Sequence, residues 1–349
     1  MPSAETDRDA EQTPNGRGLE ERPSEVDDGR VADDQNLVLL DTDIGNDIDD
    51  ALCLAYLLAQ PRCELLGITT VTAEPELRAR LASVLCRTAG RSVPILPGAA
   101  DPLAGPAVQG PPPQATALAR WEHDTGFPAG EAVEFLRQTI RAHPGDVTLL
   151  AIGPLTNVAL LFASDPEIPA MLRSLVLMGG AFGAVAGPEW NIHCDPEAAA
   201  RVYAAPVARH RSVGLDVTTR VRMDAAAFLR RCDVPLLEPV ADMSTSWFDD
   251  RPEVTFHDPL AGAVIFDPSL VSFATGEVTV TRTPGPEAGS TAWAAAAPSA
   301  TPSTAIPTAT PGATPDRTGP HQVAVDVRPA AFLDHYFRTV AAFAANGSG

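Results

Sequence analysis

Short aliphatic runs alternate with longer helix-like stretches from Leu37 to about Thr281. The aliphatic runs are typical of buried strands: LVLL (37–40), ELLGITTV (64–71), VPIL (93–96), VTLLAI (147–152), SLVLMGG (174–180) and SVGLDV (212–217). The stretches between them predict helices at 49–60, 75–89, 130–142, 156–163, 195–204 and 223–231. This alternation predicts an α/β fold with an open, mostly parallel twisted sheet and helices on both faces. Ligands of such sheets bind at the carboxyl ends of the strands.

Two segments depart from this pattern. Residues 1–35 are polar, acidic and almost free of large apolar side chains, which predicts a disordered acidic tail. Residues 283–320 consist largely of Pro, Ala, Thr, Ser and Gly, a composition that does not bury enough surface to order itself. HQVAVDV and AAFLDHYFRTVAAF then resume the pattern as a strand and a helix. We therefore predict one domain over 36–349, with 283–320 as an inserted low-complexity loop.

Charge narrows the range of partners. The formal net charge is −20, so the surface would repel a phosphate backbone, and we expect no nucleic-acid partner. All 25 basic residues are arginine. A mechanism that needs a lysine is therefore excluded.

The cysteines and the apolar runs indicate the compartment. Five cysteines are widely spaced and form no CxxC pair, which favours free thiols in a reducing cytoplasm over a disulfide framework. The N-terminus lacks an apolar leader and no apolar run reaches membrane-spanning length. We expect a soluble, cytoplasmic protein without a membrane partner.

The first predicted strand ends in an acidic cluster, DTDIGNDIDD (41–50). Carboxylates this close raise one another's pKa unless a positive charge holds them. Asp49 and Asp50 alone would suit the first turn of a helix, but that explanation leaves the other acids unexplained. Oxygen ligands without nearby His or Cys suit Ca²⁺ or Mg²⁺, not zinc. The cluster therefore predicts a divalent cation site.

DTDIGNDIDDAL resembles the N-terminal signature of the inosine–uridine-type nucleoside hydrolases, usually DxDPGxDDxxAL. Further matches follow in the family's order over roughly residues 37–345. They are GITTVTAEPELRARLA (67–82), LLAIGPLTNVAL (149–160), LVLMGGAF (175–182), EWNIHCDPEAA (189–199), VGLDVT (213–218) and HDPLAGAVIFDPSL (257–270). The resemblance implies a Rossmann-like nucleoside hydrolase fold and Ca²⁺-dependent cleavage of a ribonucleoside to free base and ribose.

The resemblance also implies the metal ligands. Ca²⁺ would be held by Asp43, by Asp50 through both oxygens, by the main-chain carbonyl of Ile152 and by Asp258. Asp43 would in addition be the base that takes a proton from the attacking water. The chemistry agrees with this set, because a cation lowers the pKa of its bound water and carboxylates stabilise a ribosyl cation.

Sugar contacts follow from the same resemblance. Asp49 would accept from the 2′-hydroxyl and Asp258 from the 3′-hydroxyl, while Glu189 and Asn191 would hold the 5′ side. Met178 would pack on the sugar.

Three more residues are candidates near the base or the sugar. His257 is the candidate for protonating the leaving base, the alternative being a residue that orients Asp258. His123, in WEHDTGF, is a weaker base-side candidate, or else a surface histidine. Trp190 stands where the family usually has Phe and would line the sugar pocket or pack in the core.

Departures from the family's pattern affect the sugar contacts. Ile44 replaces the usual Pro, and the signature carries two extra residues, so Asp47 competes with Asp49 for the ribose role. Glu74 stands where an Asn normally touches the ribose. The loop between Met178 and Glu189 is short and lacks the Asn often found there. The base preference therefore stays open.

Other functions remain as alternatives. One is a catalytically silent nucleoside- or ribose-binding protein, and another is an enzyme of the same fold that acts on a specialised nucleoside. A DxD phosphohydrolase of the haloacid-dehalogenase type is disfavoured, because that chemistry normally uses a lysine. A homodimer or homotetramer is the expected assembly.

Overall fold

The structure is a computed structural model that describes residues 35–249, 251–296 and 321–346. Residues 1–34 of the predicted tail and 297–320 of the predicted insert lie outside the described residues. The chain from Gln35 onward forms one compact unit. No described helix has the length and apolar character needed to cross a membrane.

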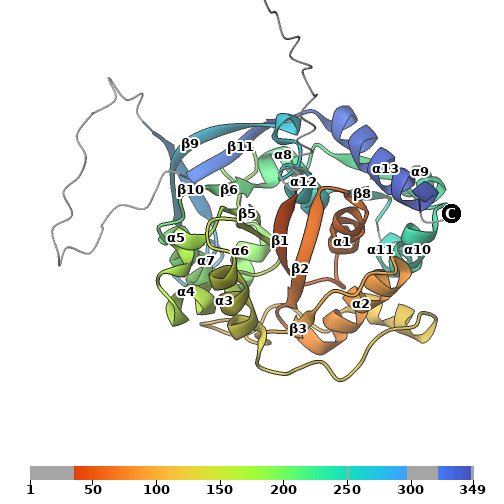
Figure 1. The fold of residues 1–349 in the computed structure, drawn as a ribbon. Coiled ribbons are helices and arrows are strands. Elements are labelled where there is room, and N and C mark those ends of the chain that lie inside the picture. The colour runs from red at the N-terminus through yellow and green to blue at the C-terminus, as the bar shows by residue number, and fades with distance from the viewer. Residues whose placement is uncertain (1–34, 250, 297–320, 347–349) are drawn as a thin grey trace, which may run out of the picture. The chain divides into compact units, whose positions relative to one another are not determined.

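A nine-stranded sheet forms the centre of this unit, in the order β10-β9-β11-β6-β5-β4-β1-β2-β3 (Figure 1). Its pairs are parallel from β3 to β11, while β9 runs antiparallel to both β11 and β10. The strands are β1 Asn36–Thr42, β2 Cys63–Thr70, β3 Ile95–Pro97, β4 Val147–Ala151, β5 Ser174–Met178, β6 His210–Val213, β9 Val271–Val280, β10 Thr291–Ala295 and β11 His321–Val327. A small second sheet pairs β7 (Arg222–Asp224) with β8 (Glu253–Thr255). The predicted open, mostly parallel α/β sheet is confirmed.

Helices cover both faces of the sheet because successive strand residues point to opposite sides. In β1, Val38 and Leu40 belong to one core and Leu39 to the other. Helices α1, α2, α12 and α13 pack on the first core, and α3, α4 and α7 pack on the second (Figure 1). The helices are α1 Asp49–Ala59, α2 Pro75–Thr88, α3 Ala132–Ala142, α4 Thr156–Ser164, α5 Ile168–Met171, α6 Trp190–Cys194, α7 Pro196–Tyr203, α8 Leu215–Thr218, α9 Ala225–Arg231, α10 Glu238–Met243, α11 Thr245–Phe248, α12 His257–Ala263 and α13 Pro329–Asn346, with 3-10 turns η2 Pro113–Ala119, η3 Pro235–Leu237 and η4 Pro268–Leu270.

Two predictions about elements were wrong. The strand predicted at 212–217 ends at Val213, because the chain turns at Gly214 and enters α8. At that turn a side chain on residue 214 would come within 2.4 Å of the Gly180 carbonyl oxygen. Within the segment 283–320, predicted not to order, Thr291–Ala295 forms β10. Its main chain pairs with β9, so backbone hydrogen bonds supply the order that the composition does not.

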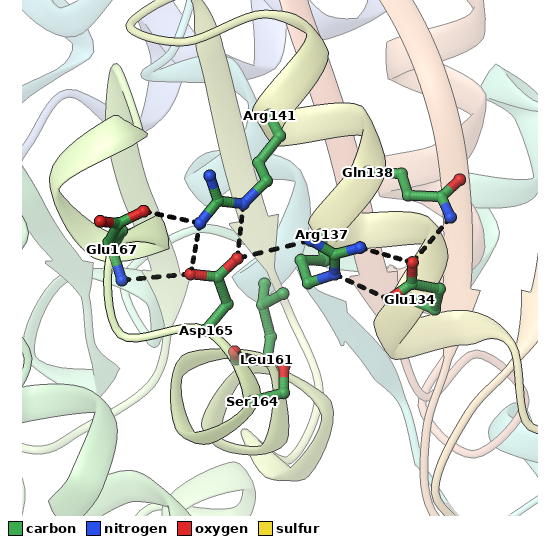
Figure 2. Close-up of polar contacts among 8 residues, drawn as sticks. All are labelled: Glu134, Arg137, Gln138, Arg141, Leu161, Ser164, Asp165 and Glu167. Carbon is green, nitrogen blue, oxygen red and sulfur yellow. Dashed lines mark hydrogen bonds and ion pairs between the residues drawn. The ribbon is translucent and has the colours of Figure 1, made fainter.

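An ion-pair network on the outer surface joins α3 to the turn between α4 and α5 (Figure 2). The Arg141 guanidinium donates to both oxygens of Asp165, at 2.6 and 2.8 Å, and to Glu167 at 2.7 Å. Arg137, one turn earlier, donates to Glu134 at 2.6 Å and lies 3.6 Å from Asp165. The network fixes the outer helices of the second face and contains no residue of the cavity described below.

Candidate active site

The order in which strands are added to the sheet switches sides at β1. The next strands along the chain, β2 and β3, lie on one side of β1, and β4 lies on the other. Such a switch point leaves a crevice outside the carboxyl ends of the two central strands. The DTDIGNDIDD segment begins there, with Asp41 and Thr42 closing β1 and Asp49 opening α1. A cavity of about 590 Å³ lies at this place.

All but one of the candidate metal, catalytic and substrate-binding residues line this cavity. They are Asp43, Asp47, Asp49, Asp50, Ile152, Met178, Glu189, Trp190, Asn191, His257 and Asp258. His123 does not line it; the ring lies in the loop after η2, with Nδ1 2.9 Å from the Trp121 carbonyl oxygen. His123 therefore stands apart from the residues that line the cavity.

Three buried carboxylates converge at the start of two helices. Asp49 and Asp50 lie in the first turn of α1, and Asp258 in the first turn of α12. One oxygen from each lies within 4.8 Å of the others. The Asp258 amide donates to Asp49 Oδ2 at 3.1 Å, and Thr42 Oγ1 donates to Asp50 Oδ1 at 2.5 Å. Backbone and hydroxyl donors thus hold part of the cluster in place.

The negative charge of this cluster is not balanced by a basic side chain bound to it within the described part of the chain. Burial raises the pKa of Asp49, Asp50 and Asp258 well above the ordinary value, and the neighbouring carboxylates raise it further. Burial likewise raises the pKa of Asp47 to about 7. Arg78 is buried close by, but its guanidinium donates to the carbonyls of Asp43 and Ile44 and to Asn46 Oδ1, not to a carboxylate. A divalent cation would supply the missing positive charge.

The donor set fits a hard cation, because every candidate ligand is an oxygen. It differs in one respect from the set that the family resemblance implies. The tight cluster contains Asp49, whereas Asp43 Oδ2 accepts from Gln109 Nε2 at 2.6 Å. The carbonyl of Ile152 accepts from Asn191 Nδ2 at 2.9 Å. Asp50 and Asp258 belong to both sets.

The opposite wall of the cavity is the short helix α6. Glu189 caps it, because its carboxylate accepts from the amides of Asn191 at 2.9 Å and Ile192 at 3.1 Å, and also from Gly180 at 3.2 Å. Asn191 Nδ2 donates to the carbonyls of Ile152 and Met178, which ties α6 to the ends of β4 and β5. The hydrogen bonds therefore fix both side chains before any ligand binds.

His257 lines the cavity at the start of α12, directly before Asp258. Its Nδ1 lies 2.7 Å from Thr218 Oγ1. Burial lowers the pKa of His257 to about 4, and the charge of Arg222 adds to this effect. The imidazole is therefore neutral near pH 7.

Sequence patterns did not identify Trp247, Arg251, Gln109 and Arg78, which lie at or beside the cavity. Trp247 and Arg251 line it, and the guanidinium carbon of Arg251 lies 3.9 Å from the centre of the Trp247 ring. Arg251 is the only arginine among the described lining residues. Gln109 and Arg78 hold the loop after β1. Gln109 lies in a Pro- and Gly-rich segment without periodicity, so no sequence signal indicated it.

Glu74, one of the departures from the family's pattern, does not line the cavity. Its side chain is exposed, and its backbone is left-handed with φ of 58°. A long side chain at φ above zero is uncommon, whereas Asn adopts this conformation more readily. The backbone turn is thus present at this position, while the side chain points elsewhere.

Comparison with known proteins identifies the family. A family model described as inosine-uridine preferring nucleoside hydrolase matches residues 38–334. Uridine nucleosidase 1 of Arabidopsis thaliana is 30% identical over 288 residues, which cover 75% of this chain and 83% of that protein. The non-specific ribonucleoside hydrolase RihC of Salmonella paratyphi A is 34% identical over 278 residues, covering 73% and 86%.

Solved structures agree with these relatives. A plant nucleoside hydrolase superposes with a TM-score of 0.69 at 25% identity, covering 87% of this chain and 98% of that chain. A purine-preferring ribonucleoside hydrolase from Gardnerella vaginalis has the same fold, with a TM-score of 0.71 at 24% identity over 88% and 99%. The chain therefore belongs to the inosine-uridine preferring nucleoside hydrolase family and is a hydrolase of N-glycosidic bonds.

Proposed function

We propose that this enzyme cleaves a ribonucleoside to free base and ribose with the help of Ca²⁺. The observation that carries the proposal is the convergence of Asp49, Asp50 and Asp258 in a cavity at the switch point of the sheet. A binding protein would have no need to bury three carboxylates against one another. The buried cluster therefore favours catalysis over a silent binding role.

Asp50 and Asp258 would be the central ligands of the cation, with Asp43, Asp49 and the Ile152 carbonyl beside them. When bound, Ca²⁺ would neutralise the cluster and lower the pKa of water. Asp43 would take the proton of the attacking water. Gln109 engages Asp43 Oδ2, which leaves Oδ1 for this task. Oδ1 faces Gly153, where an added side chain would come within 2.8 Å of it.

The remaining polar groups would bind the ribose. Carboxylate oxygens of Asp49 and Asp258 would accept hydrogen bonds from the ribose hydroxyls, and Glu189 and Asn191 lie fixed on the opposite wall. As the glycosidic bond breaks, positive charge develops on the sugar. Carboxylates held in place before the reaction stabilise that charge more than they stabilise the neutral substrate.

His257 would assist the departing base as a neutral donor. If Thr218 Oγ1 donates to Nδ1, the ring carries its proton on Nε2, the nitrogen left for a ligand. A hydrogen bond from Nε2 to a ring atom of the base would stabilise the negative charge that builds up as the bond breaks. The low pKa of His257 is compatible with this role, because donation needs no positive charge on the ring.

A substrate panel tests the proposal. Relatives are named for uridine, for purine nucleosides or for no specific base, so inosine, adenosine, uridine and cytidine all belong in the panel. We expect release of ribose reducing ends from at least one of them, and loss of turnover on chelation that added Ca²⁺ restores. Binding of a nucleoside without any ribose release would favour the silent alternative.

Assembly and location remain predictions. A homodimer or homotetramer is expected, and light scattering on the purified protein would measure its mass. A cytoplasmic location would be tested by fractionation of the cells that make the protein.

A further inference from the structure

Gln109 lies in the segment between β3 and η2, buried beside the cavity with 6% of its surface exposed. Its Nε2 donates to Asp43 Oδ2 at 2.6 Å and to Asn46 Oδ1 at 3.0 Å. Its Oε1 accepts from Trp190 Nε1 at 3.0 Å, and Cys194 Sγ lies 3.5 Å away. Every donor and acceptor of this amide therefore has a partner.

These partners allow only one orientation of the amide. Rotation by 180° would bring its carbonyl oxygen against the Asp43 carboxylate and its NH₂ group against the indole N–H of Trp190. Both contacts would be repulsive. The side chain is thus locked between two acceptors on one side and two donors on the other.

Support for the loop after β1 is divided among several side chains. Arg78 and Gln114 bind mainly its carbonyl oxygens: Arg78 reaches those of Asp43 and Ile44, and Gln114 Nε2 donates to Asp47 at 2.9 Å. Among the described residues, Gln109 is the side chain that donates to the carboxylate of Asp43. It therefore supplies the side-chain hydrogen bond that orients this carboxylate.

We propose that Gln109 is a positioning residue for ribonucleoside hydrolysis, orienting the Asp43 carboxylate and linking it to Trp190 in the wall of the cavity. The inference rests on the proposed role of Asp43 as the base. Trp190 is 51% exposed, so a ligand in the cavity can reach its ring. The Gln109 amide then joins the Trp190 ring, which would contact the substrate, to the Asp43 carboxylate, which would activate water.

The test compares Gln109→Met, Trp190→Phe and the double variant on the best nucleoside of the panel. Methionine keeps the length of the side chain and removes both hydrogen-bonding groups, while phenylalanine keeps a six-membered aromatic ring and removes the indole N–H with its five-membered ring. We expect kcat of Gln109→Met to fall about 10- to 100-fold with KM changed less than about threefold, because small misplacement of a catalytic group is costly. Trp190→Phe should lose about three- to tenfold in kcat. The double variant should be no slower than Gln109→Met, because both changes break one chain of contacts.

Gln114→Met is the matched control. Gln114 is as buried as Gln109 and supports the same loop, but through the carbonyls of Asn46 and Asp47. It should lower the melting temperature about as much as Gln109→Met while losing far less kcat. Equal kcat losses in the two glutamine variants would overturn the positioning role in favour of general support of the loop.

Other outcomes are equally decisive. Multiplying losses in the double variant would show that Gln109 and Trp190 act separately, and a wild-type kcat in Gln109→Met would refute the proposal outright. If Gln109→Met does not fold, Trp190→Phe remains as the test. An unchanged kcat in that variant would refute the proposed link from Trp190 through Gln109 to Asp43. Absence of hydrolysis by the wild-type enzyme would instead refute the proposed function, so the two failures are distinguishable.

Discussion

Substitution of Asp50 gives the most direct test of the proposed Ca²⁺ site. It belongs to the carboxylate cluster and accepts from Thr42 Oγ1, and burial with Asp43 and Asp49 nearby raises its pKa. Asp50→Asn should reduce turnover by several orders of magnitude, since it removes a charged ligand. Steady-state kinetics with saturating Ca²⁺ measure the loss.

Stability separates this role from simple helix capping. In chelator, Asp50→Asn should melt no lower than the wild type, because the variant removes one of several like charges buried together. A helix-start role predicts the opposite, a lower melting temperature with activity largely kept. The second pattern would rule out Asp50 as a ligand.

His257 distinguishes expulsion of the base from binding of the sugar. Inosine needs help for its leaving group, whereas p-nitrophenolate departs without it. His257→Ala should cut kcat on inosine by about 10²–10⁴-fold, the usual range for such catalysis, and on p-nitrophenyl riboside by less than about tenfold. Parallel assays on the two substrates give the comparison.

If His257 instead orients Asp258, its neighbour in the chain, both substrates should suffer alike. Extra Ca²⁺ would then restore part of the rate, because a misplaced ligand weakens the cation site. Equal losses would therefore end the leaving-group role of His257.

The sequence predicted the acidic residues of the site but not the side chains that hold them in place. Asp43, Asp49 and Asp50 follow a buried strand within ten positions. Their role as oxygen ligands and their place at the carboxyl end of that strand could therefore be predicted from the sequence. Arg251 lines the cavity and Gln109 lies beside it on Asp43, both in irregular segments, and only the folded chain brings them there. The exchange of Asp43 for Asp49 in the tight cluster depends on side-chain rotation, which sequence spacing does not determine.

At the scale of elements, the β9–β10 hairpin is linked to the helix that forms the cavity wall. Thr291 Oγ1 bonds both the amide and the carbonyl of Ala181, at 2.9 and 2.8 Å. His193 Nδ1, on α6, lies 2.8 Å from the Ala288 carbonyl oxygen, and a side chain at Gly289 would collide with the His193 backbone. The hairpin therefore braces α6 and the loop before it.

Two deletions test this brace. Replacing 297–320 by a short Gly/Ser loop should leave kcat and the melting temperature almost unchanged, because Ala296 and His321 both pair with β9 near Thr275 and Gly276. Replacing 283–320 removes β10 and Thr291 and should lower both. Equal behaviour of the two variants would contradict the bracing role.

Element prediction succeeded where burial alone sets the pattern. The aliphatic runs at 37–40 and 147–152 lie at the centre of the sheet, covered on both faces, and became β1 and β4. β10 was missed because TAWAA carries little apolar signal and gains its order from main-chain pairing at the sheet edge. α8 was missed because a tight approach at Gly214 ends the strand early.

At the scale of the whole molecule, a buried cluster of two histidines and a tyrosine lies at the amino end of β6, away from the cavity at the carboxyl ends of the strands. His210 opens β6, stacks on Tyr203 of α7 at 4.8 Å and meets the edge of His321 of β11 at 4.9 Å. Among the described residues, neither ring nitrogen of His210 has a hydrogen-bond partner. Burial lowers the pKa of His210 well below its usual value, and His321 lowers it further.

This position should contribute an acid-dependent loss of stability. His210 is neutral in the folded state, whereas in the unfolded chain it binds a proton below about pH 6.5. The unfolded state then binds more protons, so stability is lost as the pH falls through that value. At pH 5.5 one such histidine costs about 1.4 kcal/mol relative to pH 7.5.

His210→Phe should remove this loss while keeping an aromatic ring on Tyr203. Between pH 7.5 and pH 5.5, we expect the free energy of unfolding, measured in urea, to change in favour of the variant over the wild type by about 1.4 kcal/mol. His143→Gln, at an exposed histidine, is the control and should leave the pH dependence unchanged. The same pH dependence in wild type and His210→Phe would mean that His210 binds a proton equally well in the folded and unfolded states, which would contradict the lowered pKa.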